Sequence, residues 1–500
     1  MAALRIFDGV DTIGGNKIYL ESGGRGLLLD FGLNFGRMGE FYEEFLRLRS
    51  VRGVHDYLHL GLVPPLDIYE QTLFPSDFNP QLEQVKVDAV LLTHAHLDHC
   101  GCVGLLRRDL PVYCSAMTAA ILKAYQDSGK VELHSEVAYS RQRLGTEDPR
   151  VLEASQQADY LGRPFCLFES PSRELLGFWE GVPGEKEIQS PRLQGPCTPP
   201  LPLLRFEVEH SIFGASAYAI ETEKGWVVYT GDLRAGEGTE RFVREAAKLD
   251  VRVLVVEGTC VGRREESVSE EEVYENCLSV VEGERGLVVA DFSARHFERL
   301  QSFARVAEKT GRRLVVLPRD IYMLEALEKV DGRSRTRGLL VYRELRAMRE
   351  GWVKQVFERH RERYIDPDEI AKNPGGFILC FSFYDVKNLL DIKPKGGTYI
   401  YSGSEAFNEE ATFDFVRLWN WLKKFNLRAV GFEVRKGELK FEHGYHASGH
   451  ASSRELLELI EEIDPKMVVP VHTEDPKFFR KKVKKRKVVL PVPGEKIAIE

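Results

Sequence analysis

The residues best suited to chemistry are four metal-ligand types within six positions: His94, His96, Asp98 and His99. Their spacing excludes a ligand pair on one helix face, because helical residues two apart do not face each other. The apolar run Val87–Leu92 precedes them and predicts a buried strand. We therefore predict a loop at the end of this strand, where imidazole nitrogens and a carboxylate converge on two cations. Such a dinuclear site is typical of hydrolytic enzymes.

Three later segments place further ligand types at the ends of predicted strands. They are His210 after Leu204–Val208, Asp232 after Trp226–Thr230, and His472 after Met467–Val471. Branched and aromatic residues precede each ligand, which would fix it to rigid sheet as metal sites require. A histidine at a strand end is more often structural, so His210 gains weight only from the complete set. Imidazole and carboxylate ligands without thiolate favour zinc or manganese, and the residue types do not separate these two metals.

The composition is that of a globular protein that is not generally basic. The net charge is −8, so a nucleic-acid partner would need a local basic surface. At 500 residues, the chain predicts two or three domains. No apolar stretch reaches the roughly 18 residues of a membrane-spanning helix, and the N-terminus has no signal-peptide core. The eight cysteines lack zinc-finger spacing, which favours reduced thiols and a cytoplasmic protein without membrane association.

The pattern of short apolar runs predicts an α/β sandwich in the first part of the chain. Paired strands are predicted at Lys17–Leu20 and Gly26–Asp30, and a helix is predicted at Arg37–Ser50. The region 128–202 contains a stretch rich in Pro, Gly and Ser, and we interpret it as an insertion that decorates this core.

From about residue 265, strands and helices alternate regularly, which indicates a separate parallel-sheet domain. A last block of loop, helix and strand then returns to the pattern of the first part. We therefore predict three consecutive portions of chain: a first domain part at 1–263, a second domain at 264–436, and the C-terminal part of the first domain at 437–500.

Further short motifs accompany the ligand residues in an order that a known family shares. They are IGGN at 13–16, LDFG at 29–32, His210-Ser211 with Gly214, TGD at 230–232, EGT at 257–259, HASGHAS at 446–452 and PVH at 470–472. Together with HAHLDH at 94–99, they make the chain resemble the metallo-β-lactamase-fold hydrolases of the β-CASP group. Within that group it is similar to ribonuclease J of the archaeal type, without the bacterial C-terminal domain. The resemblance implies a metallo-β-lactamase αββα sandwich with an inserted β-CASP domain, itself a parallel α/β domain.

The resemblance also implies a metal-ligand set for two zinc ions, with manganese as the alternative. His94, His96 and His210 would hold one ion, Asp98, His99 and His472 the other, and Asp232 would bridge both. Two ions that share a ligand can stabilise the attacking and the leaving oxygen of a phosphoryl displacement together. Asp98 therefore also counts among the expected catalytic residues.

Three further residues match catalytic or supporting positions of the family. His450 matches a histidine that protonates the leaving oxygen, and Glu257 matches the acidic partner that would orient the ring and keep it charged. Without the family pattern, Glu257 is simply a strand-end carboxylate in a surface ion pair. Asp30 would brace the ligand loop rather than bind metal, and a turn residue after a strand is an equally good interpretation.

His446, Ser448 and Gly449 match a phosphate-binding clamp of the family. A helix is predicted directly after this loop, at Ser453–Ile463, and backbone N–H groups at a helix start favour an anion. The loop can also be interpreted as a helix cap, and the two roles are compatible. DNA-repair members of the group carry an apolar residue where this chain has His472, which argues for single-stranded RNA as the partner.

The leading hypothesis is a metal-dependent ribonuclease in RNA processing or decay, a 5′-to-3′ exonuclease for which endonuclease activity is left open. A DNA nuclease of the same group is the first alternative. A small-molecule metallo-hydrolase is the second, although small substrates would not need a separate covering domain. The complete ligand set argues against a binding protein without turnover. The basic run Lys477–Lys487 is either a phosphate contact or a solvated face, and a homodimer is left open.

Overall fold

The protein is described here by a computed structural model. It describes residues 2–500 except 44, 130–131, 191, 263–267, 294, 348–349, 404–408 and 436–437, and side chains are not described in 409–413. The chain divides into two compact units. The first comprises Met1–Arg264, Lys329–Asp331 and Gly449–Glu500, and the second Glu265–Glu328 and Gly332–Ser448. The predicted domain boundaries at 263/264 and 436/437 fall on residues outside the described ones, so they stay predictions.

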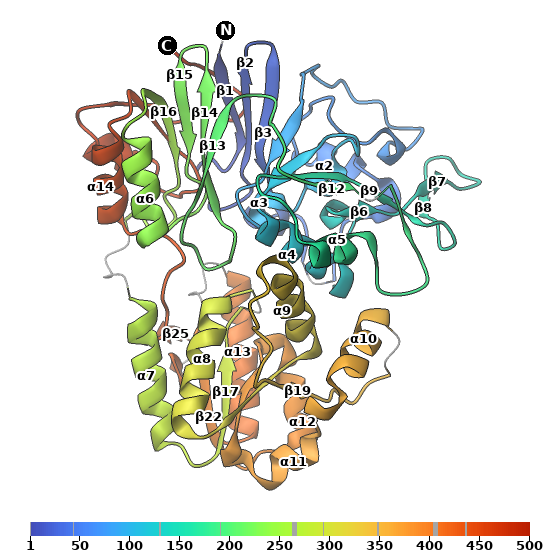
Figure 1. Cartoon of the computed structure of the whole chain (residues 1–500), viewed down its shortest axis with the longest axis vertical. Coiled ribbons are helices and arrows are strands. Elements are labelled where there is room, and N and C mark those ends of the chain that lie inside the picture. The colour runs from blue at the N-terminus through green and yellow to red at the C-terminus, as the bar shows by residue number, and fades with distance from the viewer. Residues whose placement is uncertain are drawn as a thin grey trace. The chain divides into compact units, whose positions relative to one another are not determined.

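The first unit is built on two mixed sheets (Figure 1). The larger has the order β12-β10-β5-β4-β3-β2-β1-β28 and the other the order β13-β14-β15-β16-β26-β27. The strands of the larger sheet are β1 (Ala3–Asp8), β2 (Lys17–Ser22), β3 (Arg25–Phe31), β4 (Ala89–Leu91), β5 (Val112–Cys114), β10 (Pro164–Leu167), β12 (Arg192–Gln194) and β28 (Lys496–Ala498). Those of the other sheet are β13 (Leu203–Glu207), β14 (Ser216–Thr222), β15 (Gly225–Tyr229), β16 (Val251–Val256), β26 (Met467–Pro470) and β27 (Lys487–Val488).

Alternate residues of the central strands face two different cores. In β16, Val253 and Val255 lie in the core shared by the two sheets. Leu254 and Val256 lie in a second core, which also contains residues of the helices α6 (Glu237–Ala246) and α14 (Ser453–Ile463). A period of two is what a strand buried on both faces requires. These strands are therefore a rigid support for the residues that follow them.

The segment 128–202 contributes strands to the first unit. Its strand β10 pairs in parallel with β5, where Phe165 lies opposite Val112 and is fully buried. β12 then pairs with β10 at the edge of the sheet. The segment also forms a small sheet of β6 (Tyr139–Ser140), β9 (Tyr160–Gly162) and β11 (Ile188–Gln189), and the pair β7 (Arg143–Gly145) and β8 (Leu152–Ala154). It thus extends the sandwich; that it is an insertion stays a prediction.

The second unit contains one seven-stranded sheet in the order β20-β19-β18-β21-β17-β22-β23. All neighbouring strands are parallel, as the alternation of strands and helices in the sequence predicts. The strands are β17 (Leu287–Asp291), β18 (Arg313–Val316), β19 (Leu340–Tyr342), β20 (Tyr364–Ile365), β21 (Phe377–Cys380), β22 (Gly397–Tyr401) and β23 (Leu427–Val430). The main helices are α7 (Glu270–Gly283), α8 (Phe297–Thr310), α9 (Pro318–Asp331), α10 (Gly351–His360) and α13 (Glu409–Lys424). Among the described residues of the chain, no helix is both long and apolar enough to cross a bilayer.

The helix predicted at Arg37–Ser50 is wrong. Only a short helix α1 (Phe35–Gly39) forms there; the described residues of 40–49 are not helical, and Ser50 begins a separate 3-10 turn, Ser50–Arg52. Phe45 is 84% exposed and Leu46 58% exposed, so this stretch has no apolar face packed on the core. A helix this short is marginal in water without such packing.

Candidate metal centre and active site

The predicted site residues lie at one edge of the first unit because the strands that carry them are neighbours. β15, β16 and β26 are adjacent and parallel, and Asp232, Glu257 and His472 follow them in that order. The carboxyl ends of parallel strands meet at the same sheet edge. The HAHLDH motif follows β4 of the other sheet. Both sheets of the sandwich therefore contribute to one site.

Two glycines leave room for the HAHLDH loop. Its first two histidines lie directly after β4, whereas Asp98 and His99 lie in the short helix α3 (Leu97–Cys100). A Cβ at Gly32 would lie 1.6 Å from the carbonyl oxygen of Asp98, so no residue with a side chain fits there. Gly14 has a left-handed φ of +83°, and a Cβ there would lie 2.8 Å from the Cβ of Asp98. The LDFG and IGGN motifs thus allow the ligand loop to approach both strand ends.

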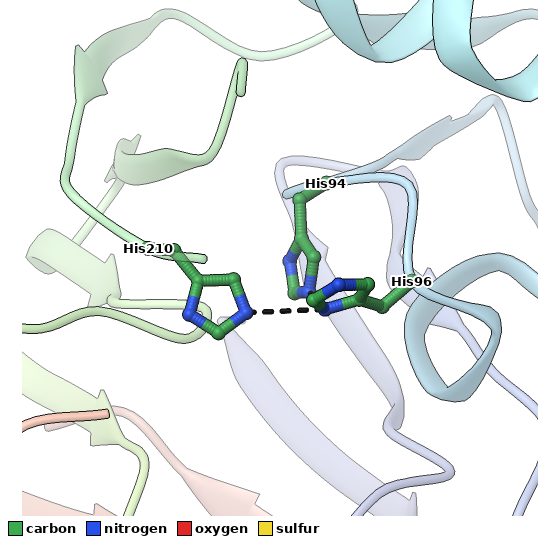
Figure 2. Close-up of side chains that lie close together, drawn as sticks. All are labelled: His94, His96 and His210. Carbon is green, nitrogen blue, oxygen red and sulfur yellow. Dashed lines mark hydrogen bonds between the residues drawn. The ribbon is translucent and has the colours of Figure 1, made fainter. Parts of the chain in front are cut away.

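The first ligand group consists of His94, His96 and His210, whose rings converge from two separate segments of the chain (Figure 2). The Nδ1 atom of His96 lies 3.1 Å from Nε2 of His94 and 3.1 Å from Nε2 of His210. One nitrogen from each ring lies within 4.8 Å of the others. This is the separation expected of imidazoles that could share one cation.

The second ligand group consists of Asp98, His99, Asp232 and His472. The Oδ2 atom of Asp232 lies 3.0 Å from Nε2 of His99 and 3.7 Å from Nε2 of His472. The same oxygen lies 3.9 Å from Nε2 of His94, which belongs to the first group. The structure therefore brings all seven predicted ligands together, with Asp232 between the two groups.

The other ring nitrogen of three of these histidines is held by a neighbouring oxygen. The pairs are His99 Nδ1 with Asp30 Oδ2 at 2.8 Å, His210 Nδ1 with the Gly449 carbonyl oxygen at 2.6 Å, and His472 Nδ1 with Thr259 Oγ1 at 2.8 Å. An N–H at Nδ1 that donates to such an oxygen leaves Nε2 as the metal-binding atom. Each Nε2 atom in turn points into the cluster.

Asp30 lies beneath the ligand loop and is fully buried. Its Oδ1 accepts a hydrogen bond from the Thr93 backbone N–H at 2.8 Å. Its Oδ2 accepts from the Thr93 hydroxyl, the Tyr229 hydroxyl and the His99 ring, each at 2.8 Å. The carboxylate thus joins both sheets to one ligand. Its predicted bracing role is consistent with these contacts and stays a prediction.

The electrostatics of the site keep two histidines neutral and one carboxylate ionised. Burial, with the neighbouring histidine charges, holds the pKa of His94 well below its ordinary value of 6.5, and burial lowers that of His210 to about 4. Burial opposes ionisation of Asp232, but the electrostatic interactions with His472 and His99 outweigh it and hold its pKa well below 3.8. Neutral imidazole and ionised carboxylate are the forms that bind metal ions.

His450 and Glu257 form a pair beside the second ligand group. His450 Nδ1 lies 2.9 Å from Oε2 of Glu257, whose other oxygen accepts from the Leu233 backbone N–H at 2.8 Å. The ring nitrogen is also 3.9 Å from Oδ2 of Asp232. Burial lowers the pKa of His450, but the charges of Glu257 and Asp232 outweigh it and raise that pKa to about 9. The ring is thus held in its proton-donating form.

The predicted phosphate-binding residues are divided between the two units. His446 belongs to the second unit, where its Nε2 lies 2.6 Å from the Gly431 carbonyl oxygen and its Nδ1 3.0 Å from that of Gly403. Ser448 ends this unit, and Gly449 begins the last segment of the first. The Gly449 carbonyl contacts His210, a role that the sequence did not indicate. Phosphate binding by the three residues stays a prediction.

Three residues that position the site were not singled out for this role from the sequence: Thr93, Tyr229 and Thr259. Each contributes a hydroxyl to a ligand or to Asp30. Thr259 lies inside the EGT motif, and Thr93 and Tyr229 directly precede the HAHLDH and TGD motifs, but a hydroxyl residue at a strand end carries no signal of its own. Only the fold shows which ring or carboxylate lies within reach.

The residues present fit divalent cations. The Oδ1 atom of Asp232 is buried and makes no hydrogen bond to any described residue, which leaves a carboxylate oxygen without a partner inside a cluster of imidazoles. Such a buried oxygen is costly unless something pairs with it. The donor set of imidazoles and carboxylates without thiolate suits zinc or manganese.

Comparison with known proteins gives two family matches and a series of similar chains. A model described as "Beta-lactamase superfamily domain" matches residues 64–157, and one described as "Zn-dependent metallo-hydrolase RNA specificity domain" matches residues 438–493. The chain is 24% identical to ribonuclease J of Pyrococcus abyssi over 95% of this chain and 90% of the relative. It is 20% identical to ribonuclease J of Methanocaldococcus jannaschii, over 93% of this chain and 89% of the relative. Ribonuclease J of Corynebacterium glutamicum is 24% identical, and the match covers 94% of this chain and 54% of the relative.

A solved structure has the same fold over almost the whole chain. It is the crystal structure of a protein of unknown function from Enterococcus faecalis V583, with a TM-score of 0.69 and 21% identity, covering 99% of this chain and 100% of that one. Together with the family match in the first unit, it confirms the predicted sandwich with a parallel-sheet domain.

Proposed function

Because the chain is a metallo-β-lactamase-fold hydrolase of the β-CASP group, we propose that it is a ribonuclease that hydrolyses RNA phosphodiester bonds with two divalent cations, zinc or manganese. One observation carries this proposal: His450, paired with Glu257, lies 3.9 Å from Asp232, where the two ligand groups meet. A proton donor at a dinuclear site is what phosphodiester hydrolysis needs.

The proposed roles follow from the contacts of Glu257 and His450. Bound cations would supply Lewis acidity toward the phosphate oxygens. Glu257 holds Nδ1 of His450, so Nε2 is the atom that would deliver a proton to the leaving oxygen. His450, His210 and Asp232 are also close enough together to hold a metal ion. However, the His450 atom near Asp232 is Nδ1, which already donates to Glu257, so His450 fits a general acid better than a metal ligand.

The substrate and direction are supported by similarity rather than by the site's geometry. The relatives from Pyrococcus abyssi and Methanocaldococcus jannaschii are named ribonuclease J, and the model matched at 438–493 is described by RNA specificity. We propose 5′-to-3′ exonuclease activity on single-stranded RNA, with His446, Ser448 and Gly449 binding a substrate phosphate. Endonucleolytic cleavage is the second mode that the test below separates.

The test uses a single-stranded RNA with a 5′-monophosphate and a 3′ label, incubated with protein and zinc or manganese. His96→Ala removes a central ligand of the first group, and His59→Ala is the matched control, because His59 is exposed and lies outside the site. We expect stepwise shortening of the labelled strand with release of mononucleotides by the wild type and His59→Ala. His96→Ala should be inactive yet still bind RNA.

Three other results would change the proposal. Discrete internal cuts would replace the exonuclease by an endonuclease. Faster cleavage of a DNA strand of the same sequence would favour a DNA nuclease. No cleavage beyond that of His96→Ala on either strand would reject the nuclease function.

A further inference from the structure

The segment Lys477–Lys487 is strongly cationic in an acidic protein. It contains eight lysine and arginine residues and no acidic residue, whereas the whole chain has a net charge of −8. Most of it lies in or directly after the short helix α15 (Lys477–Lys482). The function proposed above does not by itself require such a segment outside the metal centre.

Among the described residues, only Lys485 and Arg486 of this segment form ion pairs. Lys485 Nζ lies 2.9 Å from Oε1 of Glu461, and Arg486 lies 3.0 Å from Oε2 of Glu461 and 2.7 Å from Oδ1 of Asp464. Both acids belong to α14 or end it. These contacts fasten the end of the segment to the core and explain two of its charges.

Six other cations have no ion-pair partner among the described residues. One of them, Lys487, lies in β27, and the other five, which we call the basic surface, are Lys477, Arg480, Lys481, Lys482 and Lys484. All five are exposed, and among the described residues none of their side chains makes an ion pair or hydrogen bond. Like charges four positions apart on a helix are destabilising. Cations in a last helical turn are favoured by the helix dipole, but that effect fades within one turn. The positive charges of the basic surface therefore repel one another, and a bound polyanion would relieve this repulsion.

The basic surface is anchored next to the catalytic pair. Phe479, in the middle of α15, is fully buried and packs so closely on Gly258 that a Cβ there would lie 2.8 Å from its ring. Gly258 directly follows Glu257. α15 also begins five residues after His472, so its first Cα lies within about 18 Å of that ligand's Cα. An RNA strand that binds one phosphate at the metal centre can therefore extend to these side chains.

We propose that the basic surface binds the backbone phosphates of single-stranded RNA outside the scissile bond, which rests on the ribonuclease function proposed above. Flexible lysines bind phosphates as point charges without reading sequence. The surface would therefore add affinity and strong salt dependence without specificity for particular bases.

The test is a binding titration of the full-length protein with chelator present, so that no cleavage occurs. The probe is a labelled oligouridylate of about 20 nucleotides, longer than the roughly 4–16 nucleotides of a single-strand site. The test variant combines Arg480→Gln, Lys481→Gln, Lys482→Gln and Lys484→Gln. The matched control is Lys485→Gln with Arg486→Gln, in the same segment but paired with α14.

Each lost phosphate contact should lower the slope of log affinity against log salt by about 0.7. If all four substituted residues contact phosphate, the slope falls by about 3, and affinity at about 0.1 M salt falls by at least tenfold. The control should keep the wild-type slope. Substituting Arg for the three lysines should also keep it, because the charge remains.

An unchanged slope in the test variant would overturn the proposal, even if the wild type cleaves RNA. A reduced slope in a protein that cleaves no RNA with either zinc or manganese would keep the basic surface and reject the ribonuclease function instead. An equal loss in the control would show that the effect is not confined to the unpaired cations and would also overturn it.

Discussion

Replacement of Asp30 by Asn tests whether the buried carboxylate holds the metal centre in place. Asp30 accepts four hydrogen bonds and donates none, with donors from the Thr93 backbone and hydroxyl, the Tyr229 hydroxyl and the His99 ring. An Asn side chain has one accepting end and one donating end. Its oxygen would take the position of Oδ2, which has three donors, and its amide would face the N–H of Thr93.

The magnitude follows from these contacts. One buried donor left without an acceptor costs about 1–3 kcal/mol. Loss of the charge weakens the bond to His99 by about a further 1–2 kcal/mol, since hydrogen bonds to charged groups are roughly twice as strong as neutral ones. We expect the metal-free Asp30→Asn protein to lose about 2–5 kcal/mol of stability. Zinc affinity should fall about 10–100-fold, because His99 loses its orienting partner.

The assays are denaturant unfolding of the metal-free protein and zinc competition with a chromophoric chelator. Asp11→Asn is the matched control, because Asp11 shares a left-handed φ, +53° against +57° for Asp30, but is exposed. Asn tolerates this backbone conformation well, so backbone preference cancels between the two variants. An Asp30→Asn protein as stable as Asp11→Asn, with unchanged zinc affinity, would refute the reasoning.

Three further predictions test other parts of the first unit. His450→Ala should slow RNA cleavage about 10²–10⁴-fold while zinc content, measured by atomic emission, stays unchanged; loss of zinc would make it a ligand instead. Burial lowers the pKa of His134 to about 4. As pH drops from 6.5 to 4, the unfolded state therefore binds a proton that the folded state does not, and the free energy of unfolding should fall by up to about 3 kcal/mol. His134→Gln should flatten that decline in urea titrations at each pH. The buried Lys17 lies 2.9 Å from Asp8, so Lys17→Met should destabilise by about 3–5 kcal/mol, and adding Asp8→Asn should recover part of the loss in thermal unfolding.

The sequence predicted the strands of the sandwich well because they are buried on both faces. The runs at Gly26–Asp30, Trp226–Thr230 and Met467–Val471 are mostly apolar, and each lies within a strand or ends one residue beyond it. Such runs are unambiguous when Gly or polar residues bound them. The helix predicted at Arg37–Ser50 is wrong because the large apolar residues of that segment, such as Phe45 and Leu46, are exposed and pack on no core.

The ligand set could be assembled from the sequence because each ligand follows a strand, but the way each ring is oriented could not. The partner of His210 is a backbone carbonyl, that of Gly449, and the partner of His472 is the hydroxyl of Thr259. Neither has a side-chain type that marks it as a partner. Contacts between residues hundreds of positions apart depend on sheet order, and local pattern carries no information on that order.

The site also depends on contacts between the N-terminal and the C-terminal segments of the first unit. Asp98 and His472 are separated by 374 positions, yet their side chains lie 3.2 Å apart. The His472 backbone N–H donates to the Gly9 carbonyl oxygen at 2.8 Å, and its φ of +55° turns the ring inward. β1, which ends directly before Gly9, also pairs with β28 near the C-terminus. No local segment can therefore hold both ligand groups. Because the interactions that lower the pKa of Asp232 come partly from His472, the electrostatics of the centre exist only in the fully assembled sandwich.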